Sequence, residues 1–175
     1  MALETMPFSS EADAVQFVRQ RLEPHCSSFV LQPVLNGGLR PDIGIRLNGL
    51  DIPICIEVKR FKSGNQLSNL TDGIAQAAHY AATLQRPAFV APFCGASVTD
   101  LHWDFRVPGA MLAAGQFSVG ALMFNKYKSD EFFFALGGQV VIRVNSQGIK
   151  LHSNAAHLLI MKQRAGSKSW RKEAA

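Results

Sequence analysis

Asp42, Glu57 and Lys59 are the residues whose types and spacing point most directly to chemistry. Glu57 and Lys59 are two positions apart, so their side chains project from the same face if the segment is a strand. Charged groups at the end of an apolar strand are unfavourable unless they pair or hold an ion. Two carboxylates beside an ammonium suit a divalent metal ion. The alternative is a plain ion pair between Glu57 and Lys59, which leaves Asp42 without a role.

Two predicted strands, Leu39–Leu47 and Ile52–Arg60, bring the two carboxylates together. Asn48-Gly49 between apolar runs is a strong hairpin signal, and antiparallel pairing puts Asp42 near the level of Glu57. The second segment is almost continuously apolar before Glu57, which is typical of a strand buried on both faces of a sheet. The sequence therefore predicts a polar site at one end of a central strand.

A predicted helix over Asn69–Leu84 follows these strands. Gln76 and Tyr80 are four residues apart in it, so they share one helix face. We expect this face to turn towards the carboxylates, where the amide and the phenol would position a phosphate or a water. The alternative is that Tyr80 packs between helix and sheet and that Gln76 is a surface amide.

These motifs resemble those of a known enzyme superfamily. Pro41-Asp42, followed after fourteen residues by Glu57-Val58-Lys59, resembles the signature of the PD-(D/E)XK nucleases, and Gln76 with Tyr80 resembles the Q-x-x-x-Y motif of the RecB-like and resolvase-like branches. The resemblance covers roughly residues 10–93. It implies an α/β fold with a mixed sheet, in which a restriction-endonuclease-like core runs α-β-β-β-α-β and further strands follow.

The resemblance also implies a metal site. Asp42, Glu57 and the backbone carbonyl of Val58 would hold Mg²⁺ or Mn²⁺, and Lys59 would orient water or stabilise charge on the phosphate. In the resembled family an N-terminal helix often supplies a further glutamate, for which Glu11 is the candidate. The alternative is that Glu11 only complements the helix dipole.

The other expected elements follow from caps, breakers and apolar periodicity. Ser9-Ser10 precedes a helix that runs to about Leu22, and a strand–helix–strand connection predicts that the strand after the long helix is parallel to the strand before it. The remaining segments are a strand at Ser27–Leu35 with an edge or bulge at Pro33, a strand at Ala88–Phe93, a short helix at Pro108–Ala114, and strands at Ser118–Asn125, Glu131–Leu136, Gln139–Asn145 and Ile149–His152.

The length of 175 residues and the formal charge of +5 fit one domain with a mildly basic surface. We expect a single domain over residues 1–160 and a basic, flexible tail over residues 161–175. The tail holds five Lys or Arg residues and one Glu, so it is either a solvated end or an arm that grips phosphates. Near the site, Arg40, Arg60 and Lys62 are candidates for contacts with nucleic acid.

No apolar run is long enough to span a membrane, and the first residues lack the pattern of a secretory signal. Three widely spaced cysteines predict reduced thiols instead of a disulfide framework. Together these features favour a cytoplasmic protein with no membrane partner.

The sequence therefore predicts a metal-dependent nuclease that hydrolyses DNA, in repair, recombination, restriction or phage DNA processing. We expect it to act as a homodimer or within a larger DNA-processing complex. The alternative is a catalytically inactive nucleic-acid-binding or assembly protein with the same fold.

Overall fold

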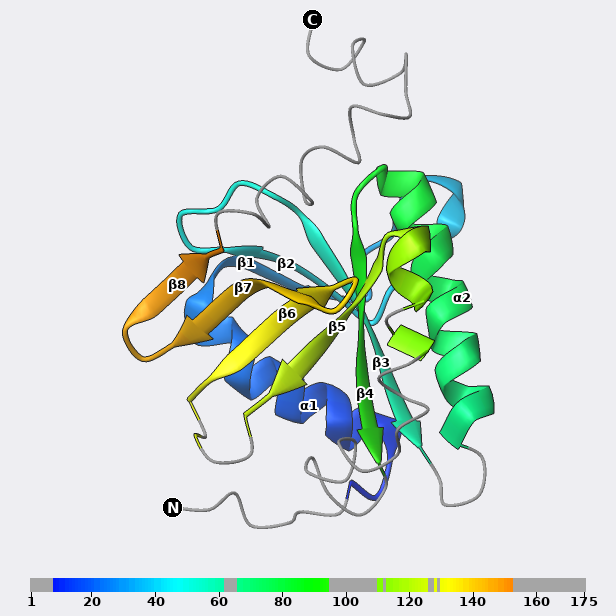
Figure 1. The fold of residues 1–175 in the computed structure, drawn as a ribbon, viewed down its shortest axis with the longest axis horizontal. Helices are drawn as coiled ribbons and strands as arrows, with labels where there is room; N and C mark the ends of the chain where they lie inside the picture. Colours follow the sequence, from blue (N-terminus) through cyan, green and yellow to red (C-terminus); the bar gives the residue numbers. More distant parts are fainter. Residues whose placement is uncertain are drawn as a thin grey trace, which may run out of the picture.

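Eight strands form one mixed sheet whose spatial order follows the order of the chain, from β1 to β8 (Figure 1). The computed structural model describes residues 8–61, 66–94, 110–111, 113–125, 128 and 130–152. Within them, the elements are α1 (Glu11–Leu22), β1 (Cys26–Leu31), β2 (Ile43–Leu47), β3 (Ile54–Phe61), α2 (Gln66–Leu84), β4 (Ala88–Cys94), β5 (Val119–Phe124), β6 (Phe132–Leu136), β7 (Gln139–Asn145) and β8 (Gly148–Leu151), with 3-10 turns at Glu23–His25, Asn36–Gly38 and Gly115–Phe117.

The central strands are parallel and the outer strands are antiparallel. β3 pairs with β4, and β4 with β5, in parallel. For β3 and β4 the reason is that α2 carries the chain across the sheet between them. All other neighbouring pairs are antiparallel. The predicted parallel crossover is therefore confirmed, and the fold is a mixed α and β structure.

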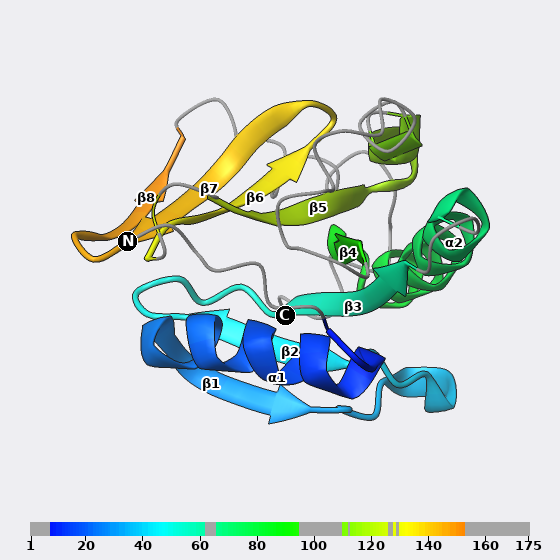
Figure 2. The same ribbon diagram turned by 90° about the horizontal axis from the view of Figure 1, so that it is seen from below.

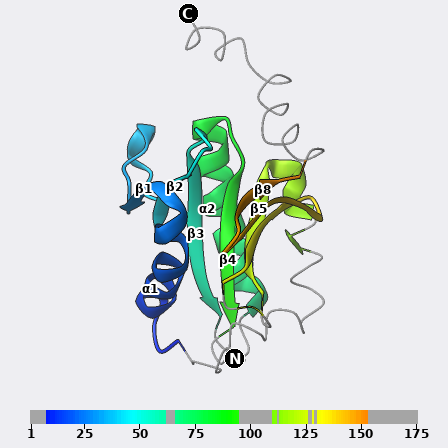
Figure 3. The same ribbon diagram turned by 90° about the vertical axis from the view of Figure 1, so that its left-hand side faces the viewer.

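α1 lies on the concave face of the curled sheet, as Figures 2 and 3 show from two directions. Ser10 caps the helix: its hydroxyl accepts a hydrogen bond from the Asp13 N–H at 3.1 Å, and the Asp13 carboxylate accepts one from the Ser10 N–H at 2.9 Å. The ring of Phe17 lies 5.1 Å from that of Phe124 on β5, edge to face. The predicted serine cap and the helix end at Leu22 are confirmed.

α2 covers the opposite face of the sheet, beside β3 and β4 (Figure 1). Its buried side chains form a second apolar cluster with inward-facing residues of the sheet, including Cys55 of β3 and Val90 of β4. Along β3 the side chains alternate, so Ile56 and Val58 pack in the cluster on the α1 side. Glu57 and Lys59 therefore point to the α2 side.

The predicted hairpin around Asn48-Gly49 is wrong in its length. β2 ends at Leu47 as predicted, but β3 begins at Ile54, so six residues connect the two strands. Pro53 lacks an N–H and restricts the residue before it, which delays the start of the ladder.

Two other strands are shorter than predicted at the proline positions. β1 ends at Leu31, before Pro33, and β2 begins at Ile43, after Pro41. β1 is the edge strand, as Pro33 indicates. Conversely, α2 begins at Gln66, three residues earlier than predicted.

The C-terminal strands are confirmed as β5 to β8, and residues 110, 111, 113 and 114 of the predicted short helix are helical. Residues 108 and 109, like the basic tail, lie outside the described residues. Among the described helices, none combines the length and the apolar character that crossing a membrane requires. Cys26 and Cys55 are free thiols, as predicted.

Candidate active site at the end of strand β3

The site lies where β2 and β3 separate. The two strands pair through Ile43 and Ile56, and one residue further on the Asp42 carboxylate accepts a hydrogen bond from the Val58 N–H at 2.8 Å. The Asp42 side chain thus supplies the hydrogen-bond acceptor that the backbone of β2 no longer supplies at this level. Because the N–H and C=O of one strand residue point to the same edge, the Val58 carbonyl also faces this edge.

Glu57 is buried, with an exposed fraction of 3%. Its Oε1 lies 2.9 Å from the Nζ of Lys59, and its Oε2 accepts a hydrogen bond from the Tyr80 hydroxyl at 3.1 Å. The same hydroxyl lies 3.3 Å from the backbone carbonyl of Arg40. Both oxygens of this carboxylate are therefore held by donors from β3 and α2, which fixes its orientation.

Asp42 is held in an environment that disfavours its charge. Burial, and then the nearby charge of Glu57, raise the pKa of Asp42 from 3.8 to about 6, with a smaller contribution from Glu11. The Val58 N–H and the ammonium of Lys59 act in the opposite direction. Two carboxylates are therefore close enough to repel each other, and one cation does not fully compensate them.

Lys59 and Tyr80 keep their protons at neutral pH. Burial disfavours the ammonium of Lys59, but the hydrogen bond and charge of Glu57, with smaller contributions from Glu11 and Asp42, raise its pKa overall. Burial, followed by the charge of Glu57, also raises the pKa of the Tyr80 phenol. Tyr80 is thus a neutral donor and Lys59 a cation.

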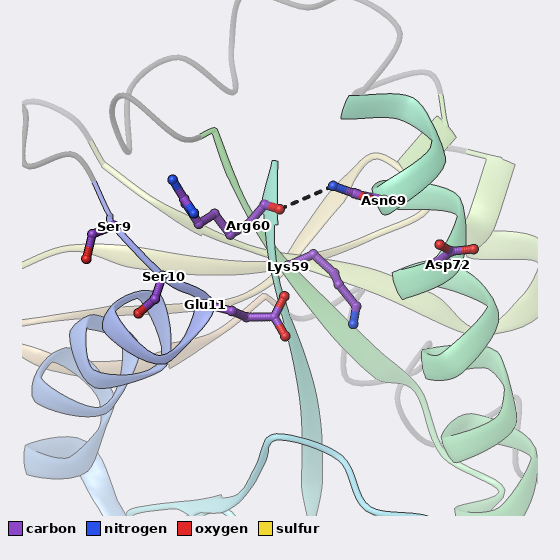
Figure 4. Close-up of a pocket in the computed structure, with 7 residues that line it drawn as sticks. All are labelled: Ser9, Ser10, Glu11, Lys59, Arg60, Asn69 and Asp72. Atoms are coloured by element: carbon purple, nitrogen blue, oxygen red, sulfur yellow. Dashed lines mark hydrogen bonds between the residues drawn. The ribbon is translucent and has the colours of Figure 1, made fainter. Parts of the chain in front are cut away.

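A pocket of about 410 Å³ opens beside the end of β3, between the first turns of α1 and α2 (Figure 4). In Figure 4, Lys59 and Arg60 project from opposite sides of β3. The Nε atom of Arg60 is buried and has no hydrogen-bond partner among the described residues. The pocket is lined by Ser9, Ser10, Glu11, Lys59, Arg60, Asn69 and Asp72.

The structure brings together half of the candidate site residues that the sequence singles out. Asp42, Val58, Glu57, Lys59 and Tyr80 form one connected group.

The other candidates lie around or outside this group. Glu11 is exposed and lines the pocket, and its charge acts on both Asp42 and Lys59. Gln76 is exposed one turn before Tyr80, and the hydrogen bond from α2 to Glu57 comes from Tyr80. The Arg40 side chain is exposed, and Lys62 lies outside the described residues.

The sequence interpretation did not assign roles to Asn69, Asp72 and Gly73 of α2. The amide of Asn69 donates to the Arg60 carbonyl at 3.4 Å, and Asp72 lines the pocket. Asn69, then Asp72 and Gly73, then Gln76, then Tyr80 follow one another at steps of three or four residues along the helix, so helical spacing places them on one side of α2.

Among the described residues, no cluster of three or more His, Cys, Asp or Glu side chains has the arrangement of a metal site. The site offers two carboxylates instead. Such a set is too small for a structural metal centre, but Mg²⁺ typically binds through one or two carboxylates and completes its shell with waters and substrate phosphates.

Comparisons with known proteins give little further information. No protein-family model matches the chain, and no curated protein matches it. The solved structure of a protein of unknown function from Silicibacter pomeroyi is similar, with 19% sequence identity over 97% of this chain and 90% of that chain. Its TM-score is 0.40, at which the likeness assigns neither a fold family nor a function.

Proposed function

We propose that this chain is a divalent-metal-dependent nuclease that hydrolyses DNA phosphodiester bonds at Asp42, Glu57 and Lys59. The observation that carries the proposal is the placement of Asp42 beside Glu57 at the strand split, where burial, and then the charge of Glu57, raise the pKa of Asp42 to about 6. A plain ion pair between Glu57 and Lys59 needs no second carboxylate. A half-buried acid that repels its neighbour is unfavourable for the apo fold, so its presence favours an ion-binding role.

The donors at the site fit Mg²⁺ or Mn²⁺. Asp42 and Glu57 supply hard carboxylate oxygens, and the Val58 carbonyl faces the same strand edge. A cation there would relieve the repulsion between the two acids. When bound, it would lower the pKa of a water molecule and polarise a phosphoryl oxygen.

The protein's own residues would orient the reactants. Lys59, protonated and held by Glu57, places a cation where negative charge develops on a phosphate. Tyr80 fixes the second oxygen of Glu57, so its role is to position that carboxylate.

The arrangement of elements supports the finer fold assignment that we propose, a restriction-endonuclease-like core. The chain runs α1, β1, β2, β3, α2, β4, and in the described residues the only other elements among these are two short 3-10 turns. The carboxylates lie on β3 and immediately before the adjoining β2, where the two strands separate, with the long helix packed behind them.

Arg60 is the strongest candidate for a contact with the nucleic-acid backbone. Its guanidinium borders the pocket and has a buried Nε with no partner among the described residues. A phosphate oxygen would satisfy such a donor. Glu11 and Asp72 line the same pocket. Because their negative charges repel a phosphate, phosphate binding there requires that these acids be neutralised or lie far from the phosphate.

The decisive experiment is incubation with supercoiled, linear, branched and single-stranded DNA, and with RNA, each with Mg²⁺, Mn²⁺ or EDTA. We expect metal-dependent cleavage of at least one DNA that Asp42→Ala and Lys59→Ala both abolish. Asp51→Ala is the matched control, because Asp51 is an exposed acid paired with Arg46 outside the site. Cleavage that persists undiminished in Lys59→Ala would place the reaction elsewhere.

Absence of cleavage with every substrate would favour the binding alternative. One feature supports that reading: Lys59 already neutralises Glu57 without a metal. A binding protein should retain salt-dependent affinity for DNA, whereas an assembly protein should lack it. A filter-binding titration at several salt concentrations separates these two outcomes.

A further inference from the structure

Gly73 of α2 lies directly against the side chain of Lys59. A Cβ atom at position 73 would come 2.7 Å from the Cγ of Lys59 and 3.5 Å from its Cε. The first distance is far below van der Waals contact, whereas the Cγ1 of Val90, at 3.5 Å, is at an ordinary distance. The lysine stem therefore occupies the space that any other residue at position 73 would fill.

The backbone gives no reason for a glycine at this position. Gly73 lies in the interior of α2 and is not among the glycines with positive φ. Glycine is unfavourable in a helix interior relative to alanine, because it loses more conformational entropy on folding. What distinguishes position 73 is its lack of a side chain beside Lys59.

The contact falls on a part of Lys59 that cannot move independently. The position of Cγ depends on χ1 alone, so relieving the overlap requires rotation of χ1 towards another staggered state. That rotation swings the whole stem, and the Nζ atom leaves its 2.9 Å contact with Glu57. A flexible side-chain end could adapt to a methyl group at little cost, but the root of this stem cannot.

We propose that Gly73 is a positioning residue, whose missing side chain lets the Lys59 stem lie across α2 and hold its ammonium against Glu57. Its effect on cleavage rests on the proposed nuclease function. Its effect on the placement of Lys59 does not rest on that function, so an experiment can contradict the positioning role and the nuclease function independently.

The first test is a double-mutant cycle on stability, measured as the melting temperature of the full chain. In the Lys59→Ala background the stem is absent, so Gly73→Ala should raise the melting temperature by about 2–4 °C, the usual gain from replacing a helical glycine. In the wild-type background the same change should give no rise, or a fall. An equal rise in both backgrounds overturns the proposal.

Ala75→Gly is the matched control for this cycle. It exchanges the same two residue types on the same helix, but position 75 is exposed. It should lower the melting temperature equally with and without Lys59. A dependence on Lys59 as large as that of Gly73→Ala would mean that the coupling is general to α2, and it would overturn the proposal.

The second test measures the exposure of Lys59. Its side chain is 15% exposed in the wild type, so displacement by Gly73→Ala should increase its labelling by an amine-reactive reagent several-fold, as read by mass spectrometry. Lys150, on the distant β8, should label at an unchanged rate. An unchanged rate at Lys59 contradicts the proposal, whether or not the protein cuts DNA.

The third test is kinetic and applies once cleavage is established. Displacing a positioned group by about 1 Å can reduce the rate about 100-fold, so Gly73→Ala should lower kcat strongly while KM for DNA changes less than about twofold. Ala75→Gly, at an exposed position of the same helix, should leave kcat unchanged. An equal fall of kcat in Ala75→Gly would show that Gly73 acts by another route.

Discussion

The Asp42 carboxylate accepts a hydrogen bond from the Val58 N–H at 2.8 Å and so continues the ladder between β2 and β3 beyond the last backbone pair. Asp42 therefore has a structural and a chemical role, which substitutions separate. Asp42→Asn keeps an acceptor oxygen, whereas Asp42→Ala leaves the N–H unpaired, at a cost of about 1–3 kcal/mol. We expect Asp42→Asn to fold normally, and both variants to lose Mn²⁺ binding and cleavage.

Urea unfolding and calorimetric Mn²⁺ titration measure these two roles. Asp51→Asn is the control, and as an exposed acid it should change stability by less than about 1 kcal/mol. Equal stability of Asp42→Asn and Asp42→Ala would mean that the hydrogen bond contributes nothing measurable.

The metal-free protein should lose stability as pH rises from about 4 to about 6. An acid whose pKa is higher in the folded than in the unfolded state binds more protons when folded, so stability falls through the interval between the two values. For Asp42 these values are 3.8 and about 6. Because the group is partly exposed, we expect Asp42→Asn to gain only about 1–2 kcal/mol over wild type across this range.

Unfolding curves at half-unit pH steps, in EDTA, test this prediction. Excess Mn²⁺ at pH 7 should stabilise the wild type, because the ion binds to the folded state. It should not stabilise Asp42→Asn, which we expect to have lost Mn²⁺ binding. Parallel pH profiles for the two proteins would exclude a raised pKa at Asp42.

Tyr80→Phe should destabilise the protein by about 1–3 kcal/mol, because one oxygen of the buried Glu57 loses its donor. Cleavage should be weakened but not abolished, since Lys59 still holds the other oxygen. Gln76→Ala is the control on the same helix: its exposed amide should contribute less than about 0.5 kcal/mol. Chemical denaturation and initial cleavage rates give both readouts, and equal stability losses in the two variants would contradict the role of Tyr80.

Arg60→Gln should weaken DNA binding without changing Mn²⁺ affinity. If Arg60 contacts one phosphate, the slope of log affinity against log salt should fall by about 1. Arg46→Gln, an exposed arginine paired with Asp51, should leave the slope unchanged. Fluorescence anisotropy at several salt concentrations measures the slope. An unchanged slope in Arg60→Gln would mean that Arg60 does not contact a DNA phosphate in this pocket.

Much of the site could be predicted because it depends on local rules. The two-residue spacing of Glu57 and Lys59 fixes their common face on any strand, and antiparallel pairing brings Asp42 to the level of Glu57. The capped first helix and the parallel crossover after β3 also follow from short-range signals.

The parts that could not be predicted depend on long-range packing. The rotation of α2 about its axis decides that Tyr80 reaches Glu57 while Gln76 remains exposed. The i,i+4 spacing shows only that the two residues share one side of the helix, not which of them contacts the carboxylate. The contact between Gly73 and Lys59 requires the distance between helix and sheet, which no local pattern encodes.

The packing of α1 has a consequence for the order of folding. Each strand pairs with its neighbour in sequence, so the sheet can grow in one direction as the chain emerges during synthesis. The first helix is different, because Phe17 also packs against Phe124, more than a hundred positions later. The packing of that helix, which carries Glu11 on its opening turn, is therefore complete only after β5 has been made.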